Sequence, residues 1–247
     1  MSTFWRESDT EPNLRVMARD IEHAGVIQTL PNEVPIFPLP DHVFLPSIQA
    51  PYRVFEPRYR ALVDWLLDQP EDDRWLAIPR LATGWQTDYH GAPPFNPVAT
   101  VGRMVSCETL RGGHFYIVVE GVARCRLSER VASEPYRIAN VEPLPDLALV
   151  GDQIDVLRTR MRAIVQTVYT LVQVLGPAAS DLAGAAQDLS DPERALYRLA
   201  AGAVDDPEVR QAILEERLVH HRAGQVQEAL TSLLALAGLH TGAAGSA

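Results

Sequence analysis

Apolar and polar positions alternate along the chain with two different periods, and the change falls near residue 146. Upstream, apolar residues recur in short runs at a spacing close to two, which is typical of β-strands with one buried face. Thirteen of the 19 prolines lie before residue 100, so strands in that half must be short and interrupted. Strands are predicted at residues 41–46, 50–55, 75–79, 98–110, 114–120, 122–131 and 136–144.

Two local signals interrupt the strand pattern. Glu56-Pro57 predicts the start of a helix, because proline suits the first turn and an acidic residue meets the positive end of the helix dipole. Arg111-Gly112-Gly113 predicts a hairpin turn, since glycine accepts positive φ without strain. The helix is expected to end near residue 70 and to bury Tyr59, Leu62, Val63 and Leu66.

Downstream of residue 146 the apolar positions step by three and four, which indicates helices. Gly176-Pro177 ends the first of these helices. Residues 190–193 form a capping box, and residues 205–208 repeat the same start signal. A last helix is expected from about residue 222 to 236, so this half should hold three or four helices. The first helix carries its apolar face on Ile154, Leu157, Met161, Ile164, Val168, Leu171 and Leu175.

These elements predict an α+β protein. A small, partly closed antiparallel β-barrel with one inserted helix is followed by a C-terminal helical bundle. We expect an N-terminal tail or short helix at residues 1–30, a β-rich part at 31–146, a helical bundle at 150–239 and a disordered tail at 240–247.

Composition narrows the chemistry. The formal charge of −10 disfavours nucleic acid, because binding to phosphates needs clustered cations, and it also disfavours an anionic membrane. The chain contains no lysine, which excludes a Walker A nucleotide site, a Schiff base and a Ser–Lys dyad. No nucleophile elbow or metal-ligand spacing occurs either. We therefore expect no enzymatic activity, no catalytic residue, no cofactor and no metal.

The cysteine count and the hydropathy bear on the compartment. Cys107 and Cys125 are too few to form a disulfide framework in a chain of 247 residues. Residues 1–20 carry charges throughout and lack the apolar core of a signal peptide. We expect no stretch to have the length and apolar character needed to cross a bilayer. A cytoplasmic protein with reduced thiols and no membrane partner is the prediction.

A row of arginines follows the predicted hairpin strands and leaves two interpretations open. As a solvated sheet face, the row would protect an exposed edge. As an RNA-binding surface, it would act together with Phe115 and Tyr116 as stacking groups. The first interpretation is favoured by the acidic net charge. The row consists of Arg103, Arg111, Arg124, Arg126 and Arg130.

Three segments carry motifs that are specific in combination. They read Pro35-Ile-Phe-Pro-Leu-Pro with Val43-Phe-Leu-Pro, then Val54-Phe-Glu-Pro-Arg-Tyr-Arg-Ala-Leu-Val63, then Val101-Gly-Arg-Met-Val105 with Val119-Glu-Gly-Val-Ala-Arg-Cys-Arg-Leu127. Together they resemble the Lon protease N-terminal (substrate-binding) domain family. The resemblance covers roughly residues 31–239.

The resemblance implies a PUA-like pseudo-barrel followed by a helical bundle, and a non-catalytic module that binds unfolded or specific client polypeptides. The AAA+ motor and the peptidase of full Lon proteases are missing from this sequence, so a stand-alone member that acts as an adaptor for proteolysis is expected. The oligomeric state is left open. The alternative is an RNA-binding PUA-like module. Family-motif residues with structural roles are expected to be Phe55, Glu56, Pro57, Arg58, Tyr59, Gly102 and Gly121.

The long segment between residues 81 and 97 is the surface candidate for polypeptide binding. It is rich in glycine and proline and carries Trp85, Tyr89 and Phe95. Aromatic side chains in a loop can anchor a partner. They can equally pack over the open end of the barrel, and the sequence does not decide between these two roles.

Overall fold

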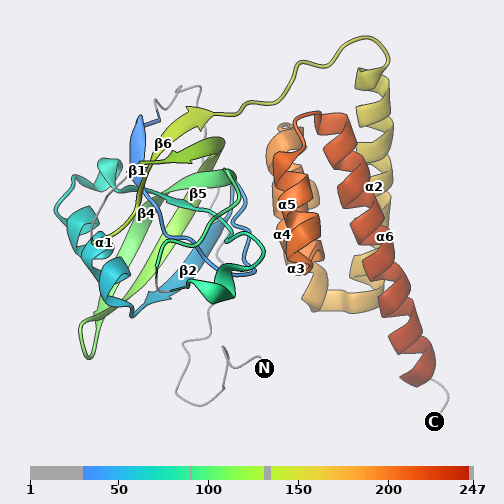
Figure 1. Cartoon of the computed structure of the whole chain (residues 1–247). Helices are drawn as coiled ribbons and strands as arrows, with labels where there is room; N and C mark the ends of the chain where they lie inside the picture. Colours follow the sequence, from blue (N-terminus) through green and yellow to red (C-terminus); the bar gives the residue numbers. More distant parts are fainter. Residues whose placement is uncertain (1–29, 90, 131–134, 188, 245–247) are drawn as a thin grey trace.

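The computed structural model describes residues 30–89, 91–130, 135–187 and 189–244, with side chains described as far as residue 238. Within these ranges it contains one six-stranded sheet and six α-helices, arranged as a β-rich barrel, which carries one of the helices, beside a bundle of the other five (Figure 1). The prediction of a tail or short helix at residues 1–30 falls almost wholly outside the described residues.

The sheet has the order β1-β6-β5-β4-β3, and all its pairs of strands are antiparallel. Strand β5 lies at the centre of the sheet. Strand β4 pairs with one edge of β5, whereas β2 and β6 pair with different parts of its other edge. Two parallel bridges, Ile36 to Ala77 and Leu39 to Arg80, join the segment after β1 to the region of β3 and partly close the barrel. The strands are β1 (Glu33–Pro35), β2 (Gln49–Val54), β3 (Trp75–Ile78), β4 (Val98–Leu110), β5 (His114–Glu129) and β6 (Ile138–Pro143).

Two strand predictions were wrong in detail. The predicted strand at 41–46 is a turn-rich segment, in which Asp41 has a φ of 47°. The strands predicted at 114–120 and 122–131 are one strand, β5, and Gly121 lies at a β-bulge within it, because Val101 pairs with Ala123 while Gly102 pairs with Gly121. The extra residue bends the strand without ending it.

The helix α1 (Pro57–Leu67) lies where the Glu56-Pro57 signal predicts it, with proline in the first turn. It buries the four predicted apolar side chains against β2, β4 and β5. At its start Glu56 is extended and its side chain makes no capping hydrogen bond. Apolar spacing and the proline signal therefore suffice to place this helix on the barrel.

The bundle contains one more helix than the upper limit predicted. A short helix, α3, follows the break at residues 176–179, in a stretch where the sequence carried no clear start signal. The last helix extends eight residues beyond its predicted end at 236. The five helices are α2 (Gln153–Leu175), α3 (Ser180–Gln187), α4 (Pro192–Ala203), α5 (Pro207–Glu215) and α6 (Val219–Ala244).

One stretch contradicts the expectation that nothing in the chain could cross a bilayer. Residues 153–187 are long and apolar enough for that by length and composition. In the structure, however, this stretch is broken between α2 and α3, and α2 packs along α6. Five apolar side chains of α2, including Ile164 and Leu171, are buried. We therefore describe α2 as an amphipathic helix that packs into the bundle with one face.

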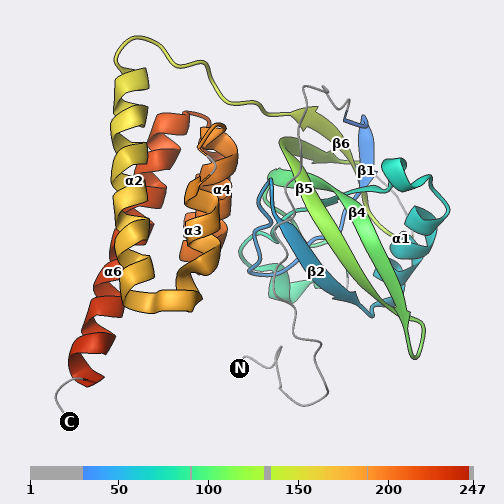
Figure 2. The ribbon, with the colours of Figure 1, turned by 180° about the vertical axis from the view of Figure 1, so that it is seen from behind.

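The barrel and the bundle share one continuous apolar core. Val43, Leu45 and Val98 from the barrel lie in the same buried cluster as the inner faces of α2, α4, α5 and α6. The helices α3, α4 and α5 lie nearer the sheet, whereas α2 and α6 form the outer side of the molecule (Figures 1 and 2). One face of α2 is therefore turned away from the barrel.

Candidate functional site

An open apolar groove of about 640 Å³ runs along the outer helix α2. Leu157 and Met161 are nearly buried and form part of its lining, while Ile154 is about half exposed. The segment that leads into α4 supplies the remaining apolar lining. The groove is lined by Ile154, Leu157, Arg158, Met161, Arg162, Val165, Gln166, Leu189 and Pro192.

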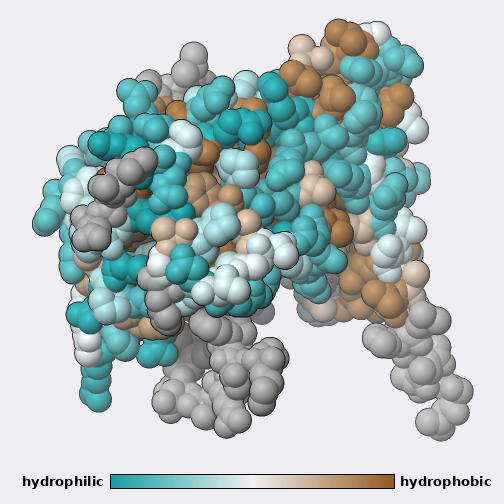
Figure 3. All heavy atoms as spheres, in the orientation of Figure 1, coloured by the Kyte–Doolittle hydropathy of each residue, from teal (hydrophilic) through white to brown (hydrophobic). Residues whose placement is uncertain are grey.

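Exposed apolar side chains continue from this groove onto the linker that enters α2. Leu147, Val150, Ile154 and Val156 are all large, apolar and more than a third exposed, although they lie within ten consecutive residues. Hydrophobic atoms gather at this end of the bundle in the space-filling view (Figure 3). Contiguous exposed apolar surface of this kind is typical of sites that contact other molecules.

The loop aromatics occupy a different part of the molecule and are not freely exposed. The ring of Trp85 packs edge-on against Tyr89, with centroids 5.4 Å apart, and the Tyr89 hydroxyl donates a hydrogen bond to Glu56. Phe95 packs beside a barrel cluster, under the guanidinium of Arg137 at 5.1 Å. The half-buried positions of Trp85, Tyr89 and Phe95 favour the role of covering the barrel.

The family-motif residues at the start of α1 hold this loop in place. The Arg58 guanidinium donates to the backbone carbonyls of Tyr89 and Gly91, at 3.0 and 3.2 Å, and forms an ion pair with Glu56 at 3.0 Å. Tyr59 is buried, and desolvation raises the pKa of its hydroxyl to about 12. The Phe55-Glu-Pro-Arg-Tyr59 element thus links α1 to the 81–97 loop, with Phe55 itself exposed.

The motif glycines Gly102 and Gly121 face each other across β4 and β5 at the bulge. A Cβ on Gly102 would meet the backbone of Glu120, and a Cβ on Gly121 would meet the carbonyl oxygen of Leu45. Both positions therefore need glycine because another part of the backbone approaches closely.

Arg124 does not lie on a solvated face, and this prediction was wrong. Its side chain is 1% exposed and donates hydrogen bonds to Asp146, to the Tyr197 hydroxyl and to the carbonyls of Leu214 and Glu216. Alternation along β5 puts Arg124 on the face opposite that of the buried Cys125, but the bundle covers the face that carries Arg124. The arginine row is therefore interrupted at its centre.

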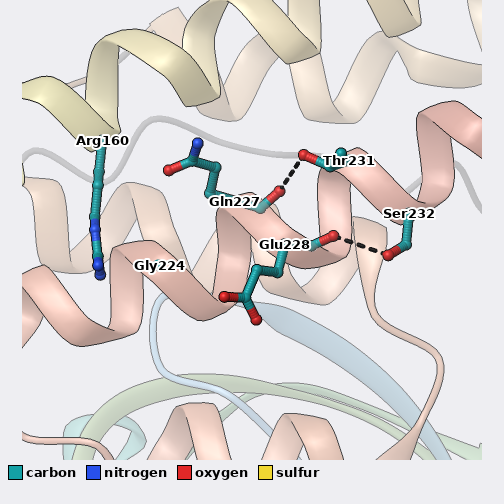
Figure 4. A pocket seen from close by; sticks show the side chains of 6 residues that line it. All are labelled: Arg160, Gly224, Gln227, Glu228, Thr231 and Ser232. Carbon is teal, nitrogen blue, oxygen red and sulfur yellow. Dashed lines mark hydrogen bonds between the residues drawn. The ribbon is translucent and has the colours of Figure 1, made fainter.

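A second, polar cavity of about 380 Å³ lies between α2 and α6. Arg160 extends from α2 across Gly224, and Glu228 lies on the same side (Figure 4). The Arg160 guanidinium donates to the His220 carbonyl at 2.6 Å, while the hydroxyls of Thr231 and Ser232 bond to their own helix. Arg160, Thr231 and Ser232 thus bond to backbone carbonyls, and the described residues that line the cavity bring together no nucleophile with a base and no metal-ligand set.

No group of three or more potential metal ligands occurs among the residues that the structure describes. Burial raises the pKa of the Cys125 thiol to about 12, and desolvation also raises the pKa of Cys107. Neither thiol is therefore activated as a thiolate at neutral pH. The adjacent histidines differ in exposure: His220 is buried, whereas His221 is half exposed.

His42 makes the stability of the fold sensitive to mild acid. Desolvation, followed by the charge of Arg210, lowers the pKa of His42 to about 4, and its Nε2 lies 2.9 Å from the Tyr52 hydroxyl. The unfolded chain binds this proton more readily, so stability should fall as the pH drops from about 6.5 towards 4. Since the side chain is partly exposed, we expect a loss of about 2 kcal/mol.

Denaturant unfolding at several pH values between 7 and 4.5 measures this loss. The variant His42→Gln should reduce the slope of stability against pH in this window. Equal slopes for the variant and the wild type would show that His42 is not the group responsible.

Comparison with known proteins places this geometry in context. The family described as "ATP-dependent protease La (LON) substrate-binding domain" matches residues 33–232. The Lon protease of Anaeromyxobacter dehalogenans is 28% identical over 190 residues, which is 76% of this chain and 22% of that protein. Lon protease 2 of Myxococcus xanthus gives the same identity and coverage. The chain thus spans about a fifth of the length of these relatives.

The same arrangement of barrel and bundle occurs in a solved structure, the N-terminal domain of Mycobacterium avium complex Lon protease. It has a TM-score of 0.61 at 15% identity and covers 81% of this chain and 98% of its own. At that identity the likeness shows the fold alone. The predicted α+β class, with a pseudo-barrel followed by a helical bundle, is confirmed.

Proposed function

Since this chain belongs to the LON substrate-binding domain family, we propose that it recognises other polypeptides and catalyses nothing itself. The observation that carries this proposal is the open apolar groove on α2, which continues into the exposed side chains of the linker. The polypeptides would be unfolded or specific clients for ATP-dependent proteolysis, and the site of action would be the cytoplasm.

The groove is a better candidate for client contact than the 81–97 loop. Ile154 and Val165 lie along an open surface, whereas Trp85 and Tyr89 pack against each other and are tied to α1. A polypeptide that binds loses conformational entropy for each residue that becomes ordered. Burial of its apolar side chains in such a groove offsets this cost and supplies most of the affinity. The groove offers this burial without rearrangement of the barrel.

A disordered model protein such as β-casein tests this proposal, with Kd measured by fluorescence anisotropy at physiological salt. Ile154→Asp and Val165→Asp should each raise the Kd about tenfold or more, because a carboxylate would replace apolar contact area. Leu236→Asp, at an exposed leucine on α6, is the matched control and should leave the Kd unchanged.

Two outcomes would contradict the proposal. If β-casein does not bind at any accessible concentration, the groove is not a client site. If Trp85→Ala weakens binding while Ile154→Asp does not, the client surface is the 81–97 loop and the role of the groove is refuted.

The alternative of RNA binding has less support, because Arg124 is buried and Arg130 and Arg103 are paired with carboxylates. A structured RNA should therefore bind weakly even at low salt. Tight binding that falls steeply with salt, and that Arg126→Ala weakens, would favour the RNA module instead.

A further inference from the structure

The charged residues that line the α2 groove are both arginines, although the chain as a whole is strongly acidic. Arg158 and Arg162 are exposed cations of the lining, and within the described part of the chain no aspartate or glutamate lines the groove. The whole chain has a formal charge of −10, so a groove whose charged lining residues are both arginines is contrary to the general trend of this surface. This local charge is available to a partner.

Both arginines are free to change partners. Arg158 pairs with Asp155 at 2.6 Å, but both side chains are more than half exposed, and such pairs contribute little to stability. Arg162 makes no ion pair with any residue that the structure describes. The two lie four residues apart on α2, so their guanidinium groups stand on the same side of the groove, about 6 Å apart at Cβ.

The length of the groove suits a helical segment. Its α2 wall extends from Ile154 to Gln166, which corresponds to about 18 Å at 1.5 Å per residue, or roughly three turns. Arg158 and Arg162 lie one helical turn apart on this wall. They match two carboxylates one turn apart on an opposing helix, because guanidinium and carboxylate groups form paired hydrogen bonds. The apolar lining matches a stripe at positions i, i+3, i+4 and i+7.

From this geometry, and resting on the function proposed above, we propose that the α2 groove takes an amphipathic helical segment of a partner polypeptide whose apolar stripe is flanked by carboxylates at i and i+4. Leu157, Met161 and Val165 contact the apolar stripe, and Arg158 and Arg162 bind the two carboxylates. The groove thereby selects acidic over basic amphipathic segments.

Three synthetic peptides of about 14 residues test this selection. They share one leucine stripe and carry glutamate, glutamine or lysine at the two flanking positions. At 50 mM salt the glutamate peptide should bind about fivefold more tightly than the glutamine peptide and at least tenfold more tightly than the lysine peptide. The differences should shrink as salt rises, because exposed charges are screened.

Charge-matched variants locate the effect. The double variant Arg158→Gln with Arg162→Gln should bind all three peptides alike, with the affinity of the wild type for the glutamine peptide. The double variant Arg111→Gln with Arg126→Gln changes the net charge by the same amount on the barrel and should retain the full discrimination. Discrimination lost equally in both variants would overturn the proposal, because net charge alone would then explain it.

Failure of this inference is distinguishable from failure of the proposed function. If the glutamine peptide binds and Ile154→Asp abolishes that binding, yet glutamate gives no advantage, charge selection is refuted while polypeptide binding stands. If no peptide binds, both fail. Peptide binding that appears only after deletion of residues 1–29 would overturn the proposal in favour of the chain's own segment. A dimer that Ile154→Asp dissociates would overturn it in favour of a second copy.

Discussion

Replacing Asp146 with alanine is expected to lower the free energy of unfolding by about 3–5 kcal/mol, because it removes the carboxylate that pairs directly with two buried arginines. Asp146 lies in the linker between β6 and α2. Its carboxylate accepts hydrogen bonds from Arg124 of β5 at 2.6 Å and from Arg222 of α6 at 2.5 and 3.0 Å. The two guanidinium side chains are 1% and 0% exposed, so water cannot replace the lost partner.

An exposed ion pair of similar geometry provides the control for this result. Glu33 pairs with Arg130 at 2.7 Å, but both side chains are about half exposed. Glu33→Ala should therefore change stability by less than about 1 kcal/mol. Equilibrium denaturation of both variants measures the difference. A loss below about 1 kcal/mol for Asp146→Ala would mean that the arginines find other partners and that the carboxylate is not the centre of the junction.

The cluster of Asp146, Arg124 and Arg222 also affects the position of the α2 groove. Asp146 fixes the linker to the barrel and to α6 at once, and Arg217 adds a bond to the linker at the Pro145 carbonyl. The linker in turn carries the exposed residues that lead into α2. A rigid junction therefore holds the α2 groove at a constant position relative to the barrel, which reduces the entropy lost when a partner binds.

Local signals in the sequence were sufficient to predict several elements of the barrel. The bounds of β4 and the four buried residues of α1 follow from periodicity and from the Glu56-Pro57 start. The turn at Gly112 and Gly113 follows from glycine, since both residues have positive φ. In each case a single short segment contains all the residues on which the prediction depends.

Arg124 shows why the rest could not be predicted in the same way. Strand alternation correctly separates it from Cys125, but alternation cannot distinguish a face covered by solvent from a face covered by helices 70 to 100 residues later in the sequence. The groove was missed for a related reason. The apolar face predicted for the first bundle helix includes Ile154, and its spacing does not show that this residue is about half exposed. Val156 and Val165 are further apolar residues of α2 that do not belong to the predicted stripe. Their presence was the signal in the sequence from which the exposed groove could have been predicted.

The second large effect is expected at Gly121, where alanine should lower the free energy of unfolding by about 3 kcal/mol. The Gly121 amide donates to the Ile48 carbonyl, and its own carbonyl accepts from the Ser47 amide, both at 2.8 Å. A Cβ there would lie 2.5 Å from the Leu45 carbonyl oxygen and 3.2 Å from the Phe44 ring. Since backbone and a buried ring form this contact, no flexible side chain can move aside.

The matched control is Gly238→Ala on α6, where an added Cβ meets no described atom within 4 Å. This variant should stay within about 1 kcal/mol of the wild type, because alanine has the higher helix propensity. Thermal and denaturant unfolding of the two variants should therefore differ strongly, although each adds the same single methyl group. Near-wild-type unfolding of Gly121→Ala would mean that residues 44–48 do not approach β5 as closely as the structure has them. The bulge would then not be the reason for glycine at this position, and the segment that carries Val43 and Leu45 into the shared core would be less firmly held.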